Sequence, residues 1–332
     1  MKIIKTSFLL IFLFSSNILY ADDKTFSDWL LSFKKLALKE GISEITFDQS
    51  MKNVKFLPKV IEYDRYQPEF YEDTKTYISK RSSKNKLKKG VDFFNDNKNL
   101  INKIDAKFEI EKELLLSLMG IETNFGTYVG KMDILSSLAT LSYDKRRSKF
   151  FTNELITILK LVDEGIIDYK ILYGSWAGAF GNFQFMPSTI KRYAIDYNRN
   201  NLIELKNNQD SFASAANYLK KMGWQKNKPC FIKIDINSNI PEKYLNTSAR
   251  KIKNRKKVKF FKKYINNFKH QEIDENLKAA IITPDSEIVD NADKLKPAYM
   301  IFKNYELILK WNRSLRFALA VCTLKEKFKN EL

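Results

Sequence analysis

A leucine-rich segment of the chain runs directly into a glutamate, Glu122. Its apolar residues recur at helical spacing: Leu114, Leu115, Leu118 and Ile121. Acidic residues at positions 111 and 113 come first, where the positive end of a helix favours them. Gly120 weakens the helix near its end, and Gly126 permits the left-handed backbone of a helix stop. We therefore expect a helix with one core-facing side and Glu122 in or just past its last turn.

This position gives Glu122 the character of a general acid. The carboxylate would face the negative end of the helix dipole, beside the apolar Ile121 and Phe125. Both the dipole and the loss of hydration are expected to raise its pKa, which a proton donor needs near neutral pH. The plainer alternative is a surface glutamate that closes a helix, because perturbed lone carboxylates are common.

A second informative segment, residues 174–189, mixes small residues with aromatic rings. The small residues are Gly174, Ala177, Gly178 and Gly181, and the rings are those of Trp176, Phe180, Phe183 and Phe185. Glycines let a ligand approach the backbone, and rings suit the apolar faces of sugars. Gln184 lies inside this apolar run, where its amide needs partners. We expect sugar groups to supply them; the alternative is a glycine-rich turn packed on a helix, with backbone partners for the amide.

The two segments resemble those of the membrane-bound lytic murein transglycosylase B family. Further matching blocks occur in the same order and at the same spacing: residues 64–70, 138–142, 146–147, 217–219, 223–224 and 311–314. The resemblance covers nearly all of the chain beyond its N-terminal leader. It implies a mainly α, α+β fold with a lysozyme-like catalytic core.

The resemblance also implies a reaction. In that family one glutamate, matched by Glu122, protonates the oxygen between N-acetylmuramic acid and N-acetylglucosamine in peptidoglycan. The same residue then takes the proton of the muramic 6-hydroxyl, and a 1,6-anhydro sugar forms without water. Ordinary glycosidases use two carboxylates. The two central motifs contain no second one.

Other roles follow from the resemblance residue by residue. Ser175 and Gln184 match contacts to the sugar near the cleaved bond, and Tyr218 matches an aromatic residue beside the catalytic acid. Arg146 and Arg147 match a basic pair suited to the lactyl or peptide carboxylates of the substrate. An ordinary core tyrosine and a solvated arginine pair are the corresponding alternatives.

Three matches are weaker: Tyr77 and Asn312 as further substrate contacts, and Phe317, which stands where the family often has tyrosine. We expect no required cofactor. A calcium loop of the family matches an alternating set of oxygen-bearing residues: Asp196, Asn198, Asn200, the carbonyl of Leu202, and Asp210. Because Asn200 and Asn201 replace an expected acid and glycine, a polar interhelical turn is the alternative.

Composition limits the other classes of function. His270 is the single histidine and lies far from both motifs, which excludes histidine-dependent triads and multi-histidine zinc sites. The net charge of +19 favours an anionic partner, and nucleic acid is one such partner, but predicted export argues against it. We expect peptidoglycan glycan strands as the partner and a monomeric protein. A noncatalytic peptidoglycan-binding scaffold of the same fold is the second hypothesis.

The N-terminus predicts export to the periplasm. Residues 1–21 combine a basic start, a short apolar run and a small residue at the end, as a secretory signal peptide does. No cysteine lies near that point, so we expect neither a lipid anchor nor a membrane span in the mature protein. Cys230 and Cys322 could pair in an oxidising compartment or remain as buried thiols.

Composition shifts along the chain suggest a division into domains. After the signal peptide we expect a helical N-terminal domain, 22–104, and a lysozyme-like catalytic core, 105–226. Within the core, apolar residues at helical spacing predict helices at 148–163, 188–197 and 211–222. An alternating pattern after Cys230 predicts a small β-rich insertion, 227–300. The C-terminal segment, 301–332, is expected to close onto the core.

Overall fold

The computed structural model describes residues 23–66, 72–266, 268 and 273–332. The predicted signal peptide, most of the block at 64–70 and His270 lie outside these residues. Helices dominate the described chain and a small sheet accompanies them, so the predicted mainly α, α+β class is confirmed. None of the described helices combines the length and the apolar character that crossing a membrane requires.

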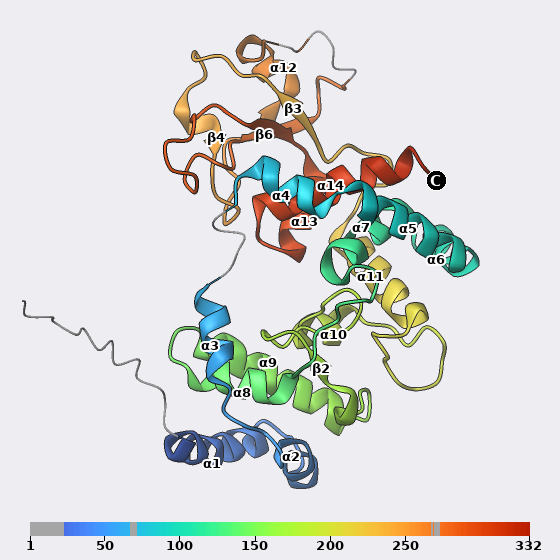
Figure 1. Ribbon diagram of the computed structural model, residues 1–332, viewed down its shortest axis with the longest axis vertical. Coiled ribbons are helices and arrows are strands. Elements are labelled where there is room, and N and C mark those ends of the chain that lie inside the picture. The colour runs from blue at the N-terminus through green and yellow to red at the C-terminus, as the bar shows by residue number, and fades with distance from the viewer. Residues whose placement is uncertain (1–22, 67–71, 267, 269–272) are drawn as a thin grey trace, which may run out of the picture.

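The helices before the catalytic segment occupy two separate places (Figure 1). They are α1 (Asp23–Lys39), α2 (Glu44–Met51), α3 (Pro58–Arg65), α4 (Thr74–Arg81), α5 (Lys84–Asp96) and α6 (Lys98–Phe108). The first three pack near α8 (Ile134–Tyr143) and α9 (Ser148–Asp163), whereas α4, α5 and α6 contact helices of the opposite half. The described residues between 23 and 104 therefore lie mostly in helices, in two separate places; the division into domains stays a proposal.

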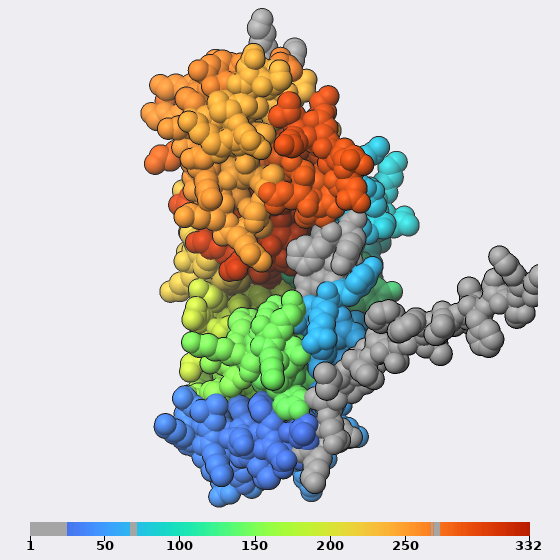
Figure 2. All heavy atoms as spheres, turned by 90° about the vertical axis from the view of Figure 1, so that its left-hand side faces the viewer, coloured from blue at the N-terminus to red at the C-terminus, as the bar shows by residue number. Residues whose placement is uncertain are grey.

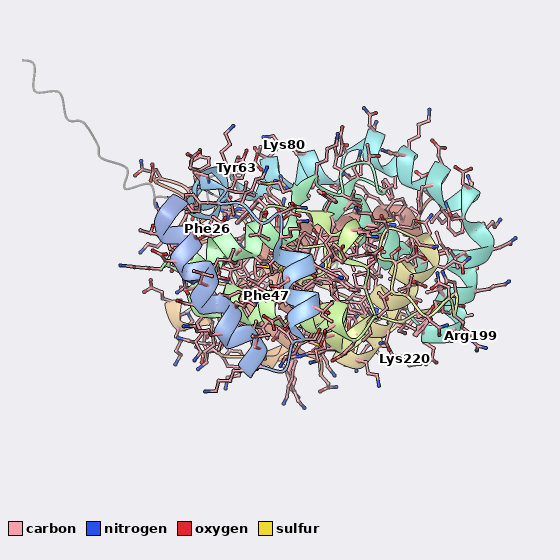
Figure 3. All side chains as sticks on the ribbon, turned by 90° about the horizontal axis from the view of Figure 1, so that it is seen from below. Phe26, Phe47, Tyr63, Lys80, Arg199 and Lys220 are labelled. Atoms are coloured by element: carbon pink, nitrogen blue, oxygen red, sulfur yellow. A yellow bond between two sulfur atoms is a disulfide. The ribbon has the colours of Figure 1, made fainter. Side chains whose placement is uncertain are left out.

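Aromatic rings join the first two helices. Trp29 stacks between Phe26 and Phe33 with ring centroids 5.5 and 5.3 Å away, and Phe33 lies 6.0 Å from Phe47 of α2. Figure 3 shows Phe26 and Phe47 at this end of the molecule. In Figure 2 these helices form one end of an elongated shape, and the β-rich segment forms the other.

The central helix is α7 (Lys112–Thr123), which packs against α5, α6, α11 (Asn208–Met222) and α14 (Leu315–Lys329). Every residue from Leu114 to Gly120 is buried. The sequence predicted a single core-facing side. The helix is instead buried on all sides, because its neighbours surround it.

The helices and short strands not yet described lie between residues 132 and 311, outside the β-rich segment. They are β1 (Met132–Asp133), a 3-10 turn (Tyr169–Ile171), β2 (Tyr173–Gly174), α10 (Pro187–Tyr193) and α13 (Lys303–Trp311). The bounds of α9 agree with the helix predicted from the sequence. By contrast, α10 ends at Tyr193, earlier than the predicted Tyr197, because the backbone of Ala194 turns to an extended conformation.

The β-rich segment has its own hydrophobic cluster, which includes Val258, Phe261, Ile281 and Met300. Its elements are β3 (Phe231–Ile234), a 3-10 turn (Glu242–Tyr244), β4 (Leu245–Asn246), β5 (Lys256–Lys257), α12 (Val258–Phe261), a 3-10 turn (Lys262–Tyr264), β6 (Lys278–Ile282) and β7 (Ala298–Ile301). The strand order is β3-β7-β6-β4, with β5 also on β6; only the β4–β6 pair is parallel.

A disulfide joins Cys230, directly before β3, to Cys322 in α14. Of the two states left open by the sequence, the structure has the paired one. The bond closes a sequence separation of 92 residues and ties the β-rich segment to the helix that packs on α7.

Removing this bond should destabilise the folded protein. The bond removes conformational entropy from the unfolded chain, and loss of the bond restores that entropy, so the Cys230→Ala/Cys322→Ala variant should lose about 2–4 kcal/mol of unfolding free energy. Urea unfolding of both proteins, with and without dithiothreitol, measures the loss. Reductant should bring the wild type to the midpoint of the variant and leave the variant unchanged; equal midpoints for the two oxidised proteins would contradict the prediction.

Candidate active site

Glu122 lies in the last turn of α7, as the sequence predicted. The helix stops at three successive residues with left-handed backbone: Asn124 at φ +51°, Phe125 at +60° and Gly126 at +76°. Left-handed phenylalanine is uncommon. The turn brings the Phe125 ring back onto Gly120, where an added Cβ would lie 2.7 Å from the ring. Gly120 therefore makes room for a ring, which the sequence argument did not anticipate.

Lys86 of α5 caps the end of this helix. Its Nζ donates to the carbonyl of Gly120 at 2.6 Å and to Asn124 Oδ1 at 3.2 Å. Burial lowers the pKa of Lys86, and the charges of Lys89 and Arg81 lower it further. The ammonium group offsets the negative helix end that the sequence argument placed beside Glu122.

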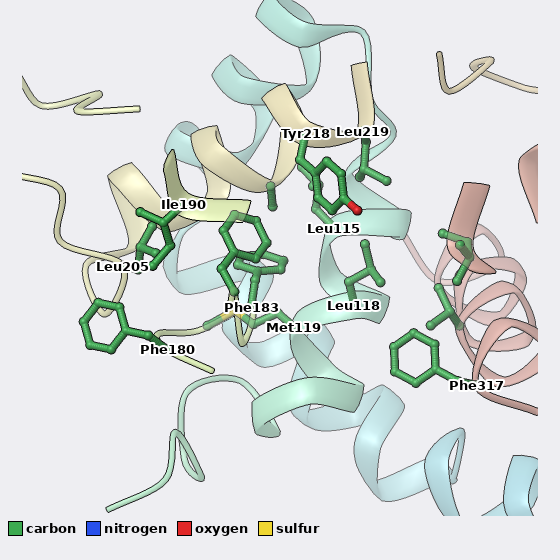
Figure 4. Close-up of a cluster of buried hydrophobic side chains, with 14 of the residues drawn as sticks. Leu115, Leu118, Met119, Phe180, Phe183, Ile190, Leu205, Tyr218, Leu219 and Phe317 are labelled. Carbon is green, nitrogen blue, oxygen red and sulfur yellow. The ribbon is translucent and has the colours of Figure 1, made fainter. Parts of the chain in front are cut away.

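The carboxyl group of Glu122 is held by an indole from a distant part of the chain. Trp311, the last residue of α13, donates its Nε1–H to Glu122 Oε1 at 3.0 Å. The Trp311 ring stacks on Tyr218 at a centroid distance of 5.0 Å, and Phe185 meets it edge-on at 5.2 Å. Tyr218, Phe185 and Trp311 form a ring cluster. This cluster holds the indole in place, and the indole holds the carboxyl group of Glu122. Figure 4 shows Phe183 and Tyr218 in the buried cluster that also contains Leu115, Leu118 and Met119 of α7.

Trp311 is the site residue that the sequence analysis missed. It belongs to the matched block 311–314, in which only Asn312 was assigned a role. A tryptophan at the end of an apolar helical run was the available signal. Its contact with Glu122 spans 189 residues of sequence, and nothing in the local pattern indicates such a contact.

Tyr218 lies beside the acid's partner, as the resemblance implied, but its hydroxyl points elsewhere. The hydroxyl donates to the carbonyl of Lys310 at 3.2 Å. Burial, and secondarily Tyr193, raises the pKa of Tyr218 to about 12. Tyr193 also stacks on its ring at 4.5 Å. Tyr218 therefore acts here as a neutral ring that supports Trp311.

The glycines of residues 174–189 serve the close packing of the loop itself. A Cβ on Gly174 would lie 2.1 Å from the carbonyl oxygen of Ala179, and one on Gly178 would lie 2.4 Å from Leu138. Ser175 Oγ accepts the backbone N–H of Ala179 at 3.0 Å. The sequence interpretation that these glycines open the backbone to a ligand is thus wrong for Gly174 and Gly178, because protein atoms fill the space.

Gln184 has backbone partners. Its Nε2 donates to the carbonyl of Gly181 at 2.9 Å and to that of Val129 at 3.2 Å. This matches the alternative weighed for Gln184 rather than the favoured sugar contact. No protein donor to its side-chain oxygen is recorded among the described residues, and a sugar contact by that atom stays a prediction.

The arginine pair binds an internal carboxylate. Arg146 Nε donates to Asp64 Oδ2 at 2.7 Å, and Arg147 pairs with the other oxygen of Asp64. Asp64 is buried at the end of α3. Both guanidinium groups thus connect α3 to the loop before α9, and a role in substrate binding remains a prediction for them.

The weaker matches lie in different settings. Tyr77 is buried in α4 with the Arg81 guanidinium 3.5 Å above its ring. Asn312 is the C-cap residue directly after α13, and its backbone N–H donates to the carbonyl of Ile308. Phe317 is buried in α14. Their contacts with a substrate are untested.

In the predicted calcium loop, the carboxylates of Asp196 and Asp210 accept hydrogen bonds from backbone N–H groups of the loop itself. Asp196 accepts the backbone N–H groups of Asn200 and Asn201, at 3.2 and 2.8 Å. Asp210 is fully buried and accepts those of Tyr197, Asn198 and Glu204. Within the described residues no cluster of three acidic, histidine or cysteine ligands is present. The donor set is rich in amides and fits a hard cation poorly.

Comparisons with known proteins find a matching family and similar structures. A family model described as a transglycosylase SLT domain matches residues 25–326. Membrane-bound lytic murein transglycosylase B of Escherichia coli K12 is 37% identical over 151 residues, which are 45% of this chain and 42% of that protein. The match therefore spans less than half the length of that relative.

Two solved structures share the fold. SltB3 from Pseudomonas aeruginosa in complex with NAG-NAM-pentapeptide matches with a TM-score of 0.80 at 28% identity. The match covers 92% of this chain and 79% of the SltB3 chain. The Escherichia coli lytic transglycosylase Slt35 in complex with calcium matches with a TM-score of 0.74 at 25% identity. This match covers 91% of this chain and 93% of the Slt35 chain. The lysozyme-like fold and the resemblance are both confirmed, and this chain belongs to the transglycosylase SLT domain family.

Proposed function

We propose that the protein is a lytic transglycosylase that cleaves the β-1,4 bond between N-acetylmuramic acid and N-acetylglucosamine in peptidoglycan. The observation that carries this proposal is Glu122, a carboxylic acid at the end of a buried helix and fixed by the Trp311 indole at 3.0 Å. Family membership and the substrate complex of SltB3 support the same substrate class.

Glu122 acts first as an acid and then as a base. It protonates the glycosidic oxygen as the bond to muramic C1 breaks, and the substrate's acetamido group stabilises the positive charge at C1. The resulting carboxylate then takes the proton of the C6 hydroxyl, whose oxygen attacks C1. The acid regains its proton, the product is a 1,6-anhydro end, and no water is consumed.

The indole determines which carboxyl oxygen carries the proton. An indole N–H can only donate, so it pairs with the unprotonated oxygen, Oε1. The transferable proton therefore resides on Oε2. When Glu122 is ionised, the same hydrogen bond stabilises the carboxylate, and the geometry is kept through both steps.

The proposed place of action is the periplasm, where glycan strands are the partner. The disulfide between Cys230 and Cys322 suits an oxidising compartment. The chemistry uses no cofactor, because the side chain of Glu122 performs both proton transfers. Calcium in the loop around Asp196 would serve structure rather than the reaction, and its amide-rich donors suit the ion poorly.

Glu122→Gln should abolish most of the activity. Glutamine keeps the shape of the side chain but cannot donate the proton, so the release of soluble fragments from purified sacculi should fall by about 10² or more. Mass spectrometry of the wild-type digest should show 1,6-anhydro ends. Glu164→Gln, at an exposed glutamate after α9, is the matched control and should keep full activity.

Two outcomes would count against the assignment. Normal digestion by Glu122→Gln would mean that another group is the acid. Retention of the wild type on sacculi without any released sugar would favour the noncatalytic scaffold.

Trp311→Phe isolates the contribution of the indole N–H. Phenylalanine keeps a ring against Tyr218 but removes the donor, so kcat should fall about tenfold to a hundredfold. Turnover of soluble glycan fragments measures this, and Trp29→Phe in the distant α1 is the control. If Trp311→Phe turned over at the rate of the control while remaining folded, the proposed role of the hydrogen bond would be wrong.

A further inference from the structure

A cavity of about 590 Å³ lies between α4, α14 and the strands β3 and β7. Its volume is typical of sites for small organic ligands, roughly 300–1,000 Å³. Helix α14 packs against both α4 and α7, and the residues lining the cavity include none of the ring cluster around Glu122. The cavity is therefore distinct from the proposed catalytic centre.

Four lysines line this cavity: Lys75, Lys233, Lys296 and Lys327. The first three are exposed, and Lys327 Nζ donates to Ser82. Within the described parts of the chain, none of the four forms an ion pair, whereas lysines on other elements, such as Lys34, Lys80, Lys220 and Lys262, do. Four ammonium groups that form no ion pair with the described residues therefore border one cavity.

The carboxylates in the same lining do not cancel this charge. Asp285 is bound by Arg316 at 2.9 Å and by the backbone N–H of Thr74 at 3.0 Å. Asp235 is exposed and accepts the side-chain N–H of Asn266 at 3.2 Å. One of the two acids is thus neutralised by its own arginine, so the cavity has a net positive charge.

The rest of the lining is largely apolar. Ile78 comes from α4 and Ile234 from β3. Ala298 and Tyr299 begin β7, and Pro297 directly precedes that strand. An inorganic anion gains nothing from such a surface. A ligand with hydrocarbon parts and several separated anionic groups uses both features, since each lysine acts as a separate point charge.

We propose that this cavity is a second binding site, for a short peptide that carries several carboxylates, as the stem peptides of peptidoglycan do. This inference rests on the proposed function for its source of peptide. A stem held here belongs to a part of the sacculus away from the bond at Glu122. The site would keep the enzyme on its insoluble substrate between cleavage events.

Calorimetric titration with a free stem tetrapeptide, without any sugar, tests the site directly. The cavity variant replaces three exposed lysines by glutamine: Lys75→Gln, Lys233→Gln and Lys296→Gln. The matched control makes the same change of charge at exposed lysines elsewhere: Lys52→Gln, Lys149→Gln and Lys221→Gln. Wild type and control should bind the peptide with the same Kd, and the cavity variant should bind at least about tenfold more weakly.

Equal affinity in the cavity variant and the control would overturn the proposal, as would the absence of saturable binding to the folded wild type. Inorganic phosphate provides a further arm. If inorganic phosphate competes with the peptide and its own Kd equals that of the peptide, the cavity recognises charge alone and the assignment to a peptide is wrong. The titration involves no bond cleavage, so a wild type that binds the peptide but forms no anhydro ends would refute only the proposed function.

Discussion

The complete burial of α7 is the constraint on which the site depends. Four helices pack around it, and its residues from Leu114 to Gly120 have no outward face. A close-packed interior resists sliding or rotation of such a helix, so its last turn is a fixed point. Glu122 lies at that point, and Trp311 reaches it from α13. The rings of Tyr218 and Phe185 then restrict the indole. The Glu122 carboxyl group is therefore oriented by its own helix, α7, and by the indole at the end of α13.

Two sets of charged groups are compensated within the protein. Lys86 binds the carbonyl end of α7, and the two adjacent arginines converge on the buried Asp64. Removal of either arginine would weaken the compensation of the buried Asp64 carboxylate, so the arginine pair supports the fold, and its role in substrate binding stays a prediction. Four lysines that form no ion pair with the described residues border the cavity beside α4, and the lining of this cavity includes none of the rings around Glu122.

The sequence predicted local features well and distant contacts poorly. Helical spacing predicted α9 with the observed bounds, and the glycine at 126 predicted the stop after Glu122. Both follow from neighbouring residues. The Trp311–Glu122 hydrogen bond, the Asp64 pairing and the filled spaces beside Gly174 and Gly178 depend on segments far apart in the sequence. Residue types alone cannot show whether an arginine faces a substrate or a buried carboxylate.

The central claim is that a single carboxyl group cleaves the glycan without water. Digestion of purified sacculi in water enriched in heavy oxygen tests it most directly, because a hydrolase must place one oxygen atom of the solvent on every new muramic end. Mass spectrometry should find muramic ends that carry no heavy oxygen and have the mass of the 1,6-anhydro sugar. Reducing muramic ends labelled with heavy oxygen would contradict the account and would make water, rather than the substrate's own hydroxyl, the acceptor.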